Sequence, residues 1–239
     1  MNTDTTYSST FGNSVADAMP AERASFIRKT YAHVALALIV FAGLVSILVN
    51  TETARDLAIT MTGGWNWLIV LAAFMGVSWL AQSWASSTTS KPMQYMGLTL
   101  YTVAQSIIFL PLLFVASQYS NSTEMIAQAG VVTLGLFAGL TAVVFITQKD
   151  FSFLGPILAI GGFVALGFIA SGILFGFTLG SLFAFVMVAF AGAAILYETS
   201  NMLHHYNTNQ HVAASLGLFA SVALLFWYIL QIFMGGNDD

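Results

Sequence analysis

Seven long apolar runs dominate this sequence and limit what it can fold into. Each has about the 20 residues that a helix needs to cross the hydrocarbon core of a bilayer. Only 7% of the residues are charged, whereas a soluble domain carries about 25%. We therefore predict an all-α integral membrane protein. The predicted crossings are 30–49, 65–82, 95–117, 125–147, 153–173, 179–199 and 211–233.

The break between the fifth and sixth runs, around Gly176 and Thr178, is short and apolar. The two runs can therefore also be taken as one interrupted segment, which gives six crossings and moves Glu198 to the other side of the membrane. A single helix through both runs would be far longer than one crossing requires, so seven crossings are favoured. Pro111, deep in the third run, is expected to kink that helix.

The basic residues predict the orientation, because loops on the cytoplasmic side carry an excess of Lys and Arg. Arg55 alone falls on the side opposite the N-terminus. The prediction is an N-terminus in the cytoplasm and a C-terminus outside. Residues 1–25 are polar and are predicted to form a flexible cytoplasmic tail before a seven-helix domain at 26–239. The N-terminal side carries Arg23, Arg28, Lys29, Lys91 and Lys149.

Composition also excludes several classes of site. The chain has no cysteine, so disulfides and thiolate metal sites are excluded. Six basic residues cannot form a nucleic-acid patch. An intramembrane serine protease or a seven-helix zinc amidase would need histidines at membrane depth, and no histidine lies in the middle of a predicted crossing. We expect no enzyme, cofactor or metal site.

Glu198, in the stretch ILYETSNMLHHY (195–206), is the only acidic residue inside a predicted crossing. Ala184, Ala191 and Ala194 share its helix face, because offsets of 3, 4 and 7 residues stack along a helix. Small residues mark the faces on which membrane helices pack, so Glu198 is expected to point into the bundle. A carboxylate at membrane depth tends to mark an ion or proton pathway, which predicts a titrating role. The alternative is an ordinary, hydrated position at the headgroup level.

Six cytoplasmic-side residues are candidate partners of Glu198. His205 lies seven residues after Glu198, on the same face if the helix continues past Ser200. A Glu/His cluster could sense pH or hold a metal, but interfacial loop histidines are the simpler interpretation, and the spacing falls short of HExxH. Lys149 is followed by Asp150 in a short loop, where the two can neutralise each other. The six candidates are His33, His204, His205, His211, Arg28 and Lys149.

Three stretches resemble the Bax inhibitor-1 family, in particular its bacterial YccA-like branch. The resemblance extends from about Phe26 to the C-terminus, and it implies six helices around a central seventh in a bacterial inner (plasma) membrane. A small-residue ridge of Ala213, Gly217 and Ser221 suits a central helix. The stretches are TQKDFSFLG (147–155), ILYETSNMLHHY (195–206) and AASLGLFASVALLFWYILQIF (213–233).

The resemblance also implies a function. Some members are described as pH-sensitive calcium leak channels, gated by a carboxylate pair between helices six and seven and steadied by an arginine of helix two. Glu198 corresponds to the first carboxylate, and Ser221 or a near neighbour stands at the second. Helix seven has no acid and 65–82 has no arginine, so the latch is incomplete. We predict a calcium or proton leak with Glu198 and Ser221 as gating residues.

The alternative is a non-conducting modulator or binding partner of a membrane-anchored AAA protease of the FtsH type, in membrane protein quality control. The resemblance implies this partner, because the YccA-like branch is known for such an association. The polar N-terminal tail would suit the encounter.

Overall fold

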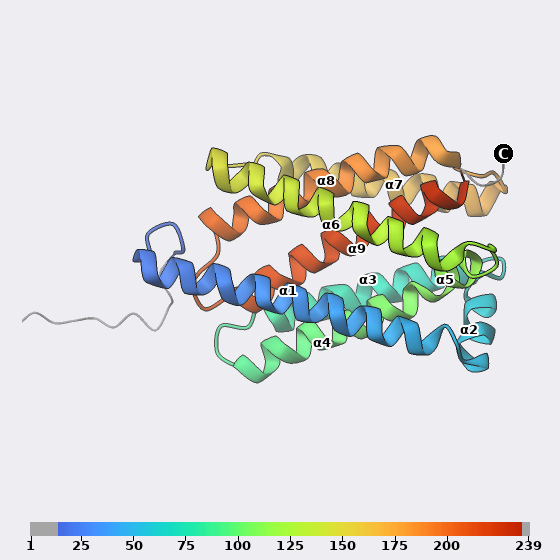
Figure 1. Ribbon diagram of the computed structural model, residues 1–239, viewed down its shortest axis with the longest axis horizontal. Helices are drawn as coiled ribbons and strands as arrows, with labels where there is room; N and C mark the ends of the chain where they lie inside the picture. The colour runs from blue at the N-terminus through green and yellow to red at the C-terminus, as the bar shows by residue number, and fades with distance from the viewer. Residues whose placement is uncertain (1–13, 236–239) are drawn as a thin grey trace, which may run out of the picture.

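Nine helices follow one another along residues 14–235, the part of the chain that the computed structural model describes (Figure 1). They are α1 (Pro20–Leu48), α2 (Glu52–Thr62), α3 (Asn66–Ala85), α4 (Lys91–Ile108), α5 (Leu110–Ala116), α6 (Ser122–Thr147), α7 (Leu154–Phe175), α8 (Gly180–His204) and α9 (His211–Gly235).

Seven helical stretches in this part of the chain are long and apolar enough to cross a membrane, with α4 and α5 counted together. This confirms the seven predicted crossings. α7 ends at Gly176, with φ of 73°, and α8 begins at Gly180, with φ of 67°. Because this left-handed backbone separates two helices, the six-crossing alternative is excluded.

The third crossing is broken where Pro111 predicts a kink. α4 ends at Ile108, and α5 begins at Leu110 with Pro111 in its first turn. A proline is tolerated there because the first turn of a helix has no internal partner for its N–H. Phe109, which is fully buried, lies between the two helices.

The crossings alternate in direction, so the described chain begins and finishes at opposite ends of the bundle (Figure 1). One end, called the N-terminal end below, carries the start of α1 and the loops at 86–90, 148–153 and 205–210. The opposite end, called the far end, carries α2 and the end of α9.

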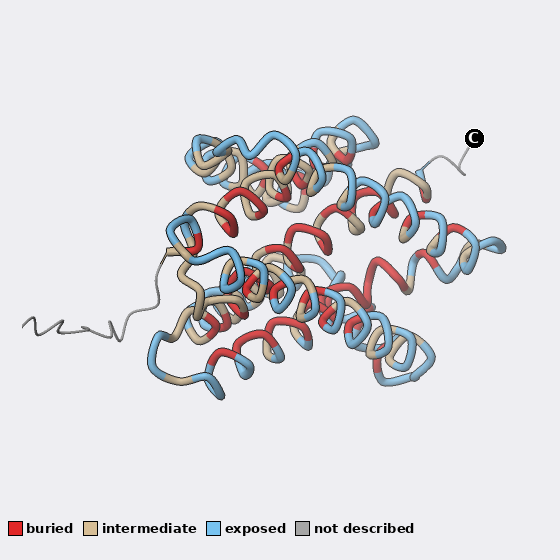
Figure 2. Tube along the Cα trace, turned by 60° about the vertical axis from the view of Figure 1, so that its left-hand side comes forward, coloured by how far each residue is buried: buried red, intermediate tan, exposed pale blue. Residues whose placement is uncertain are grey.

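α9 forms the centre of the bundle. In its most apolar window 56% of the residues are buried, close to the 61% of the α4–α5 crossing and far above the 17% of α1 and of α6. It contacts α1, α3, α4, α6 and α8 and runs between the α1–α5 group and the α6–α8 group (Figures 1 and 2). The predicted arrangement of six crossings around a central C-terminal helix is confirmed.

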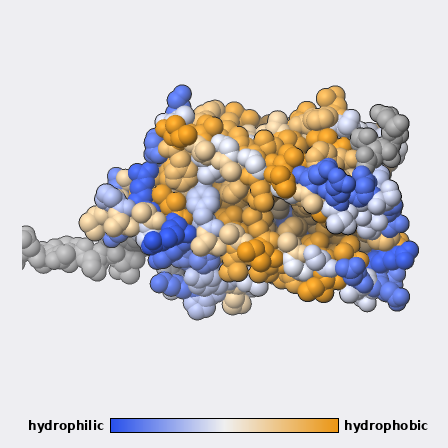
Figure 3. All heavy atoms as spheres, in the orientation of Figure 1, coloured by the Kyte–Doolittle hydropathy of each residue, from blue (hydrophilic) through white to orange (hydrophobic). Residues whose placement is uncertain are grey.

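The outer surface is apolar around the middle of the bundle, and hydrophilic side chains gather towards its two ends (Figure 3). Large apolar side chains face outwards on several helices, among them Trp79 and Phe163, each 75% exposed, and Ile146, 81% exposed. Surfaces of this kind need hydrocarbon as their solvent. The chain is an integral membrane protein.

The sequence did not predict α2, whose residues fall in a stretch taken as polar punctuation. Thr51 caps it by accepting a hydrogen bond from the N–H of Ala54 at 3.3 Å. Ala54 and Ala58 are buried against α5, and the guanidinium of Arg55 lies over the ring of Phe114, 5.5 Å from its centroid. α2 therefore closes the far end of the bundle beside α5.

The described part of the predicted tail packs against the bundle. The N–H of Val15 donates to the carbonyl of Tyr206 at 2.9 Å, and the Val15 side chain is fully buried beside Met202 and Leu203. α1 begins at Pro20, six residues before the predicted domain boundary at 26. Residues 1–13 of the predicted flexible tail lie outside the described residues.

Candidate functional site

Glu198 lies near the N-terminal end of the bundle, on the face of α8 that packs against α9. Ala191 and Ile195 precede it on this face, and both are fully buried. The carboxylate lies against Gly217 of α9: a Cβ atom at Gly217 would be 2.5 Å from Oε2 and 3.1 Å from Oε1. The absence of a side chain at Gly217 therefore makes the space that the carboxylate occupies.

Oε2 of Glu198 is buried, and it has no hydrogen-bond partner in residues 14–235. Removing a carboxylate oxygen from water without a donor or a counter-charge is costly. Lys, Arg and His side chains make no ion pair with Glu198 within these residues. The site is therefore open to a proton, a cation or a water molecule, each of which would satisfy the oxygen.

Ser221 lies one helical turn beyond Gly217 on α9 and is 6% exposed. Its Oγ donates to the carbonyl of Gly217 at 3.0 Å. This bond within the helix uses the hydroxyl, so the structure does not pair Ser221 with Glu198. Ser221, which was predicted to stand in place of the second carboxylate, is therefore hydrogen-bonded within α9 and not to Glu198.

A tyrosine lies near Glu198 in the loop between α8 and α9. Burial raises the pKa of the Tyr206 phenol, and the charges of Glu198 and then Tyr197 raise it further. Tyr206 thus stays a neutral phenol at physiological pH. It is an electrostatic neighbour of Glu198 that sequence reasoning did not identify.

Three hydroxyl groups gather on another face of α8, on Tyr31 of α1, Thr141 of α6 and Thr199 of α8. They are buried and have no hydrogen-bond partner in the described residues. The phenol of Tyr31 lies near both threonine hydroxyls without meeting hydrogen-bond geometry. Thr199 directly follows Glu198, but successive residues of a helix point in different directions. These hydroxyls therefore form a second unsatisfied polar group, between α1, α6 and α8, apart from the carboxylate that faces α9.

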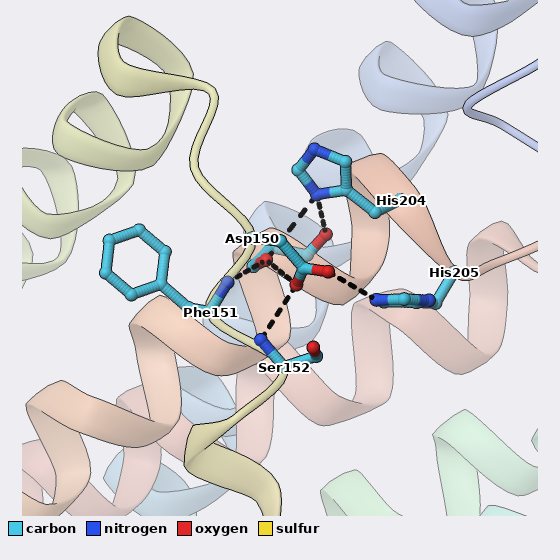
Figure 4. Close-up of polar contacts among 6 residues, drawn as sticks. Asp150, Phe151, Ser152, His204 and His205 are labelled. Carbon is cyan, nitrogen blue, oxygen red and sulfur yellow. Dashed lines mark hydrogen bonds and ion pairs between the residues drawn. The ribbon is translucent and has the colours of Figure 1, made fainter.

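The second of the two adjacent histidines, His205, contacts the loop between α6 and α7. The Nε2 atom of His205 lies 3.3 Å from Oδ2 of Asp150, and Oδ1 of Asp150 accepts hydrogen bonds from the N–H of Ser152 at 2.8 Å and the hydroxyl of Ser200 at 3.2 Å. His204 donates from Nδ1 to the carbonyl of Ser200 at 2.9 Å (Figure 4). We call Asp150, Ser152, Ser200 and His205 the Asp150 cap.

The Asp150 cap decides between interpretations that the sequence left open for His205 and for Asp150. α8 ends at His204, so His205 follows the last helical residue and pairs with Asp150 instead of Glu198. Asp150 likewise pairs with His205 instead of neutralising its neighbour Lys149.

The remaining candidates lie elsewhere at the N-terminal end. His33 and His211 have ring centroids 5.2 Å apart, and His33 stacks on Tyr95 at 5.5 Å. Arg28 and Lys149 are exposed, and neither makes an ion pair with a residue that the structure describes. The structure therefore brings none of the six candidates to Glu198.

Comparisons with known proteins identify the family. The model of the family described as "Inhibitor of apoptosis-promoting Bax1" matches residues 23–239. The chain belongs to the Bax inhibitor-1 family. An uncharacterized protein of Pseudomonas aeruginosa is 31% identical, over 91% of this chain and 93% of that protein. Bax inhibitor 1 of Schizosaccharomyces pombe is 30% identical, over 94% and 82%, and Protein lifeguard 4 of Mus musculus is 24% identical, over 95% and 92%. The family resemblance seen in the sequence is confirmed.

The role of Asp150 in this Bax inhibitor-1 family member was not predicted from the sequence. A signal was present, because Asp followed two residues later by Ser is the pattern of a side chain that bonds its own backbone. The hydrogen bond from the N–H of Ser152 to Asp150 has this geometry. The bond from the N–H of Phe151 to the hydroxyl of Ser200, at 2.8 Å, has no such local signal.

Acid should release the Asp150 cap. The N–H of Ser152 is the main cause that lowers the pKa of Asp150. The carboxylate therefore stabilises the loop above its ordinary pKa of about 3.9, and this contribution is lost as the pH falls through the lower, folded value. Deuterium exchange at the Ser152 amide, corrected for its intrinsic pH dependence, should accelerate several-fold only below about pH 4. Asp150 is largely exposed, so the effect should stay local.

Asp150→Asn is the matched control for this measurement. An asparagine keeps an oxygen that can accept from the Ser152 N–H but does not titrate. Its Ser152 amide should stay protected at all pH values tested. The same acid-induced release in Asp150→Asn would contradict the assignment.

Proposed function

We propose that this Bax inhibitor-1 family member is a cation leak, for calcium or protons, in which Glu198 is the titrating group near the cytoplasmic side. The observation that supports this is the buried, unpartnered Oε2 of Glu198 against Gly217 of the central helix. Groups of this kind in membrane helices mark ion and proton pathways. The five basic residues at the N-terminal end favour a cytoplasmic N-terminus, with the C-terminus outside.

The proposed chemistry follows from the two protonation states of a single buried carboxyl group. A proton on Glu198 neutralises it and lets it pack between α8 and α9. Loss of the proton leaves a charge that attracts a cation or water towards the buried oxygen. Calcium prefers six to eight oxygen ligands, so a single carboxylate suits passage of the ion better than tight binding.

This mechanism differs from a paired latch. Two carboxylates that share a proton titrate as a coupled pair with two separate steps. Here α9 presents Gly217 and Ser221 opposite α8, and the Ser221 hydroxyl bonds within its own helix. We therefore expect a single titration step instead of two.

The test is flux in liposomes that contain the purified full-length protein. Calcium- and pH-sensitive dyes inside the vesicles should report entry of calcium or protons that changes with external pH. Empty liposomes and liposomes with heat-denatured protein serve as controls. Flux equal to that of empty liposomes at every pH would overturn the proposal.

A second function is modulation of a membrane-anchored AAA protease, engaged through the N-terminal segment. One contact favours it: Val15 is hydrogen-bonded to Tyr206, in the loop that follows α8. A partner that pulls on the preceding residues would therefore act on the loop that carries Tyr206, close to Glu198.

Deleting residues 1–12 tests this second function while keeping Val15 in place. Co-purification with an AAA protease of the FtsH type should fall at least about tenfold in pull-down assays, because the deletion removes the segment proposed to engage the protease. Full-length protein with Lys149→Ala, on the same end of the bundle, is the control. Equal recovery of the protease by the truncated and full-length chains would contradict it.

A further inference from the structure

A cavity of about 690 Å³ lies between the two helix groups, away from Glu198. α3 and α7 form its sides, α8 adds Met187, and α9 forms its floor with Trp227 and Tyr228. Its volume is within the range of sites that hold small molecules. The lining is mostly apolar, as such sites are.

Small residues on α7 create this space. Gly162 and Ala165 stand where larger side chains would enter the cavity. A Cβ atom at Gly162 would meet only Phe190, at 3.9 Å, so a larger residue there has room to extend. The outer faces of both side helices are bare of protein: Ile69 of α3 is 67% exposed and Ile160 of α7 is 66% exposed. An occupant would therefore come from the surrounding lipid.

One polar side chain in the wall has a buried oxygen atom with no hydrogen-bond partner among the described residues. Gln105 of α4 lines the cavity and is 6% exposed, and its Oε1 makes no hydrogen bond to any described residue. Leaving a buried amide oxygen unsatisfied costs free energy that a bound polar group would recover. A hydroxyl fits best, because it both donates and accepts and so matches either orientation of the amide.

Aromatic rings form the wall near this amide. Trp67 and Trp227 are stacked, with centroids 6.2 Å apart and planes at 17°. Phe109 meets Trp227 edge-on at 4.9 Å. Rings held in this way present a broad, rigid apolar surface, which suits a hydrocarbon chain or a fused ring.

We propose that the cavity binds a hydroxylated membrane lipid, with its apolar body along Trp67 and Trp227 and its hydroxyl hydrogen-bonded to the Gln105 amide. The site is independent of the leak: Glu198 is not part of its lining. Lipid binding and ion flux can therefore be tested separately.

The experiment uses full-length protein in lipid nanodiscs and a long-chain primary alcohol that carries a diazirine in mid-chain. After irradiation, labelled peptides are located by mass spectrometry over a series of probe concentrations. Labelling should saturate on segments that line the cavity, in α3, α7 and α9. The unlabelled alcohol should compete at least about fivefold better than the alkane of equal length, which is the ratio expected for one hydrogen bond.

Two variants with a matched control decide the location. Gly162→Leu should place a side chain inside the cavity and raise the half-saturating probe concentration at least about tenfold. This is the effect expected when part of the probe can no longer bury its apolar surface there. Gly167→Leu makes the same change on α7 outside the lining, where a Cβ atom has nothing within 4 Å, and should bind like the wild type. Gln105→Leu should weaken binding of the alcohol about fivefold and leave competition by the alkane unchanged.

Three results would overturn the proposal. The first is labelling that does not saturate and spreads over the lipid-facing surface. The second is equal binding by Gly162→Leu and Gly167→Leu. The third is unchanged binding of the alcohol by Gln105→Leu, which removes the basis for the hydroxyl. If Gly162→Leu does not fold, the proposal is still tested by two measurements. They are the competition between alcohol and alkane in the wild-type protein and the binding of the alcohol by Gln105→Leu.

Discussion

Glu198→Gln should abolish most of the pH dependence of cation flux while leaving the fold intact. Glutamine has the size of glutamate and fits against Gly217, but its amide does not titrate. On the flank of its titration, the minority form of a single carboxyl changes about tenfold per pH unit. The wild-type flux should follow this change, and the variant should show a flat profile in the same liposome assay.

Glu124→Gln is the matched control, since it makes the same substitution at an acid near the start of α6. Glu124 accepts a hydrogen bond from Gln128 at 2.9 Å and is exposed. Its flux should keep the wild-type pH profile. A wild-type profile in Glu198→Gln would remove the role assigned to Glu198, even if the protein conducts.

Gly97→Ala should lower the free energy of unfolding by about 2–3 kcal/mol, the usual cost of overpacking a close contact. Gly97 of α4 faces α3, and a Cβ atom there would lie 2.5 Å from the carbonyl oxygen of Ala81 and 2.6 Å from the backbone nitrogen of Ala85. Both alanines are fully buried. The two helices would have to move apart, because backbone atoms cannot rotate away.

Unfolding in mixed micelles with increasing denaturing detergent measures this effect. Gly76→Ala, on α3, is the control, because a Cβ atom at Gly76 would have nothing within 4 Å. It should unfold like the wild type or slightly later, since alanine favours helix over glycine. Identical midpoints for Gly97→Ala and Gly76→Ala would show that the α3–α4 contact is not close in solution.

The architecture was predictable because membrane crossings leave a strong local signal. About 20 apolar residues in a row mark each helix, and the left-handed glycines at Gly176 and Gly180 lie in the short break that separated the fifth and sixth crossings. α2 was missed for the opposite reason. With 11 residues and mixed polarity, it is too short to cross and resembles a loop. The bond between Val15 and Tyr206 joins distant segments, which no local pattern reveals.

The candidate site was predictable only in part. The small-residue face of α8 indicated that Glu198 faces another helix, and its carboxylate lies against Gly217. The neighbours of the candidate residues were harder to predict, because residues on other helices come together only when the helices pack. Asp150 meets His205 across two loops. The space beside Gln105 likewise depends on how α3 and α7 are placed around α9.

Infrared difference spectroscopy tests the central claim, that Glu198 exchanges a proton inside the bundle, most directly. Spectra of the protein in lipid are recorded over the pH range in which flux changes, for the wild type and for Glu198→Gln. We predict a C=O stretching band of a protonated carboxyl group that titrates in one step in the wild type and is missing from the variant. Spectra of the two proteins that change identically with pH would contradict the account.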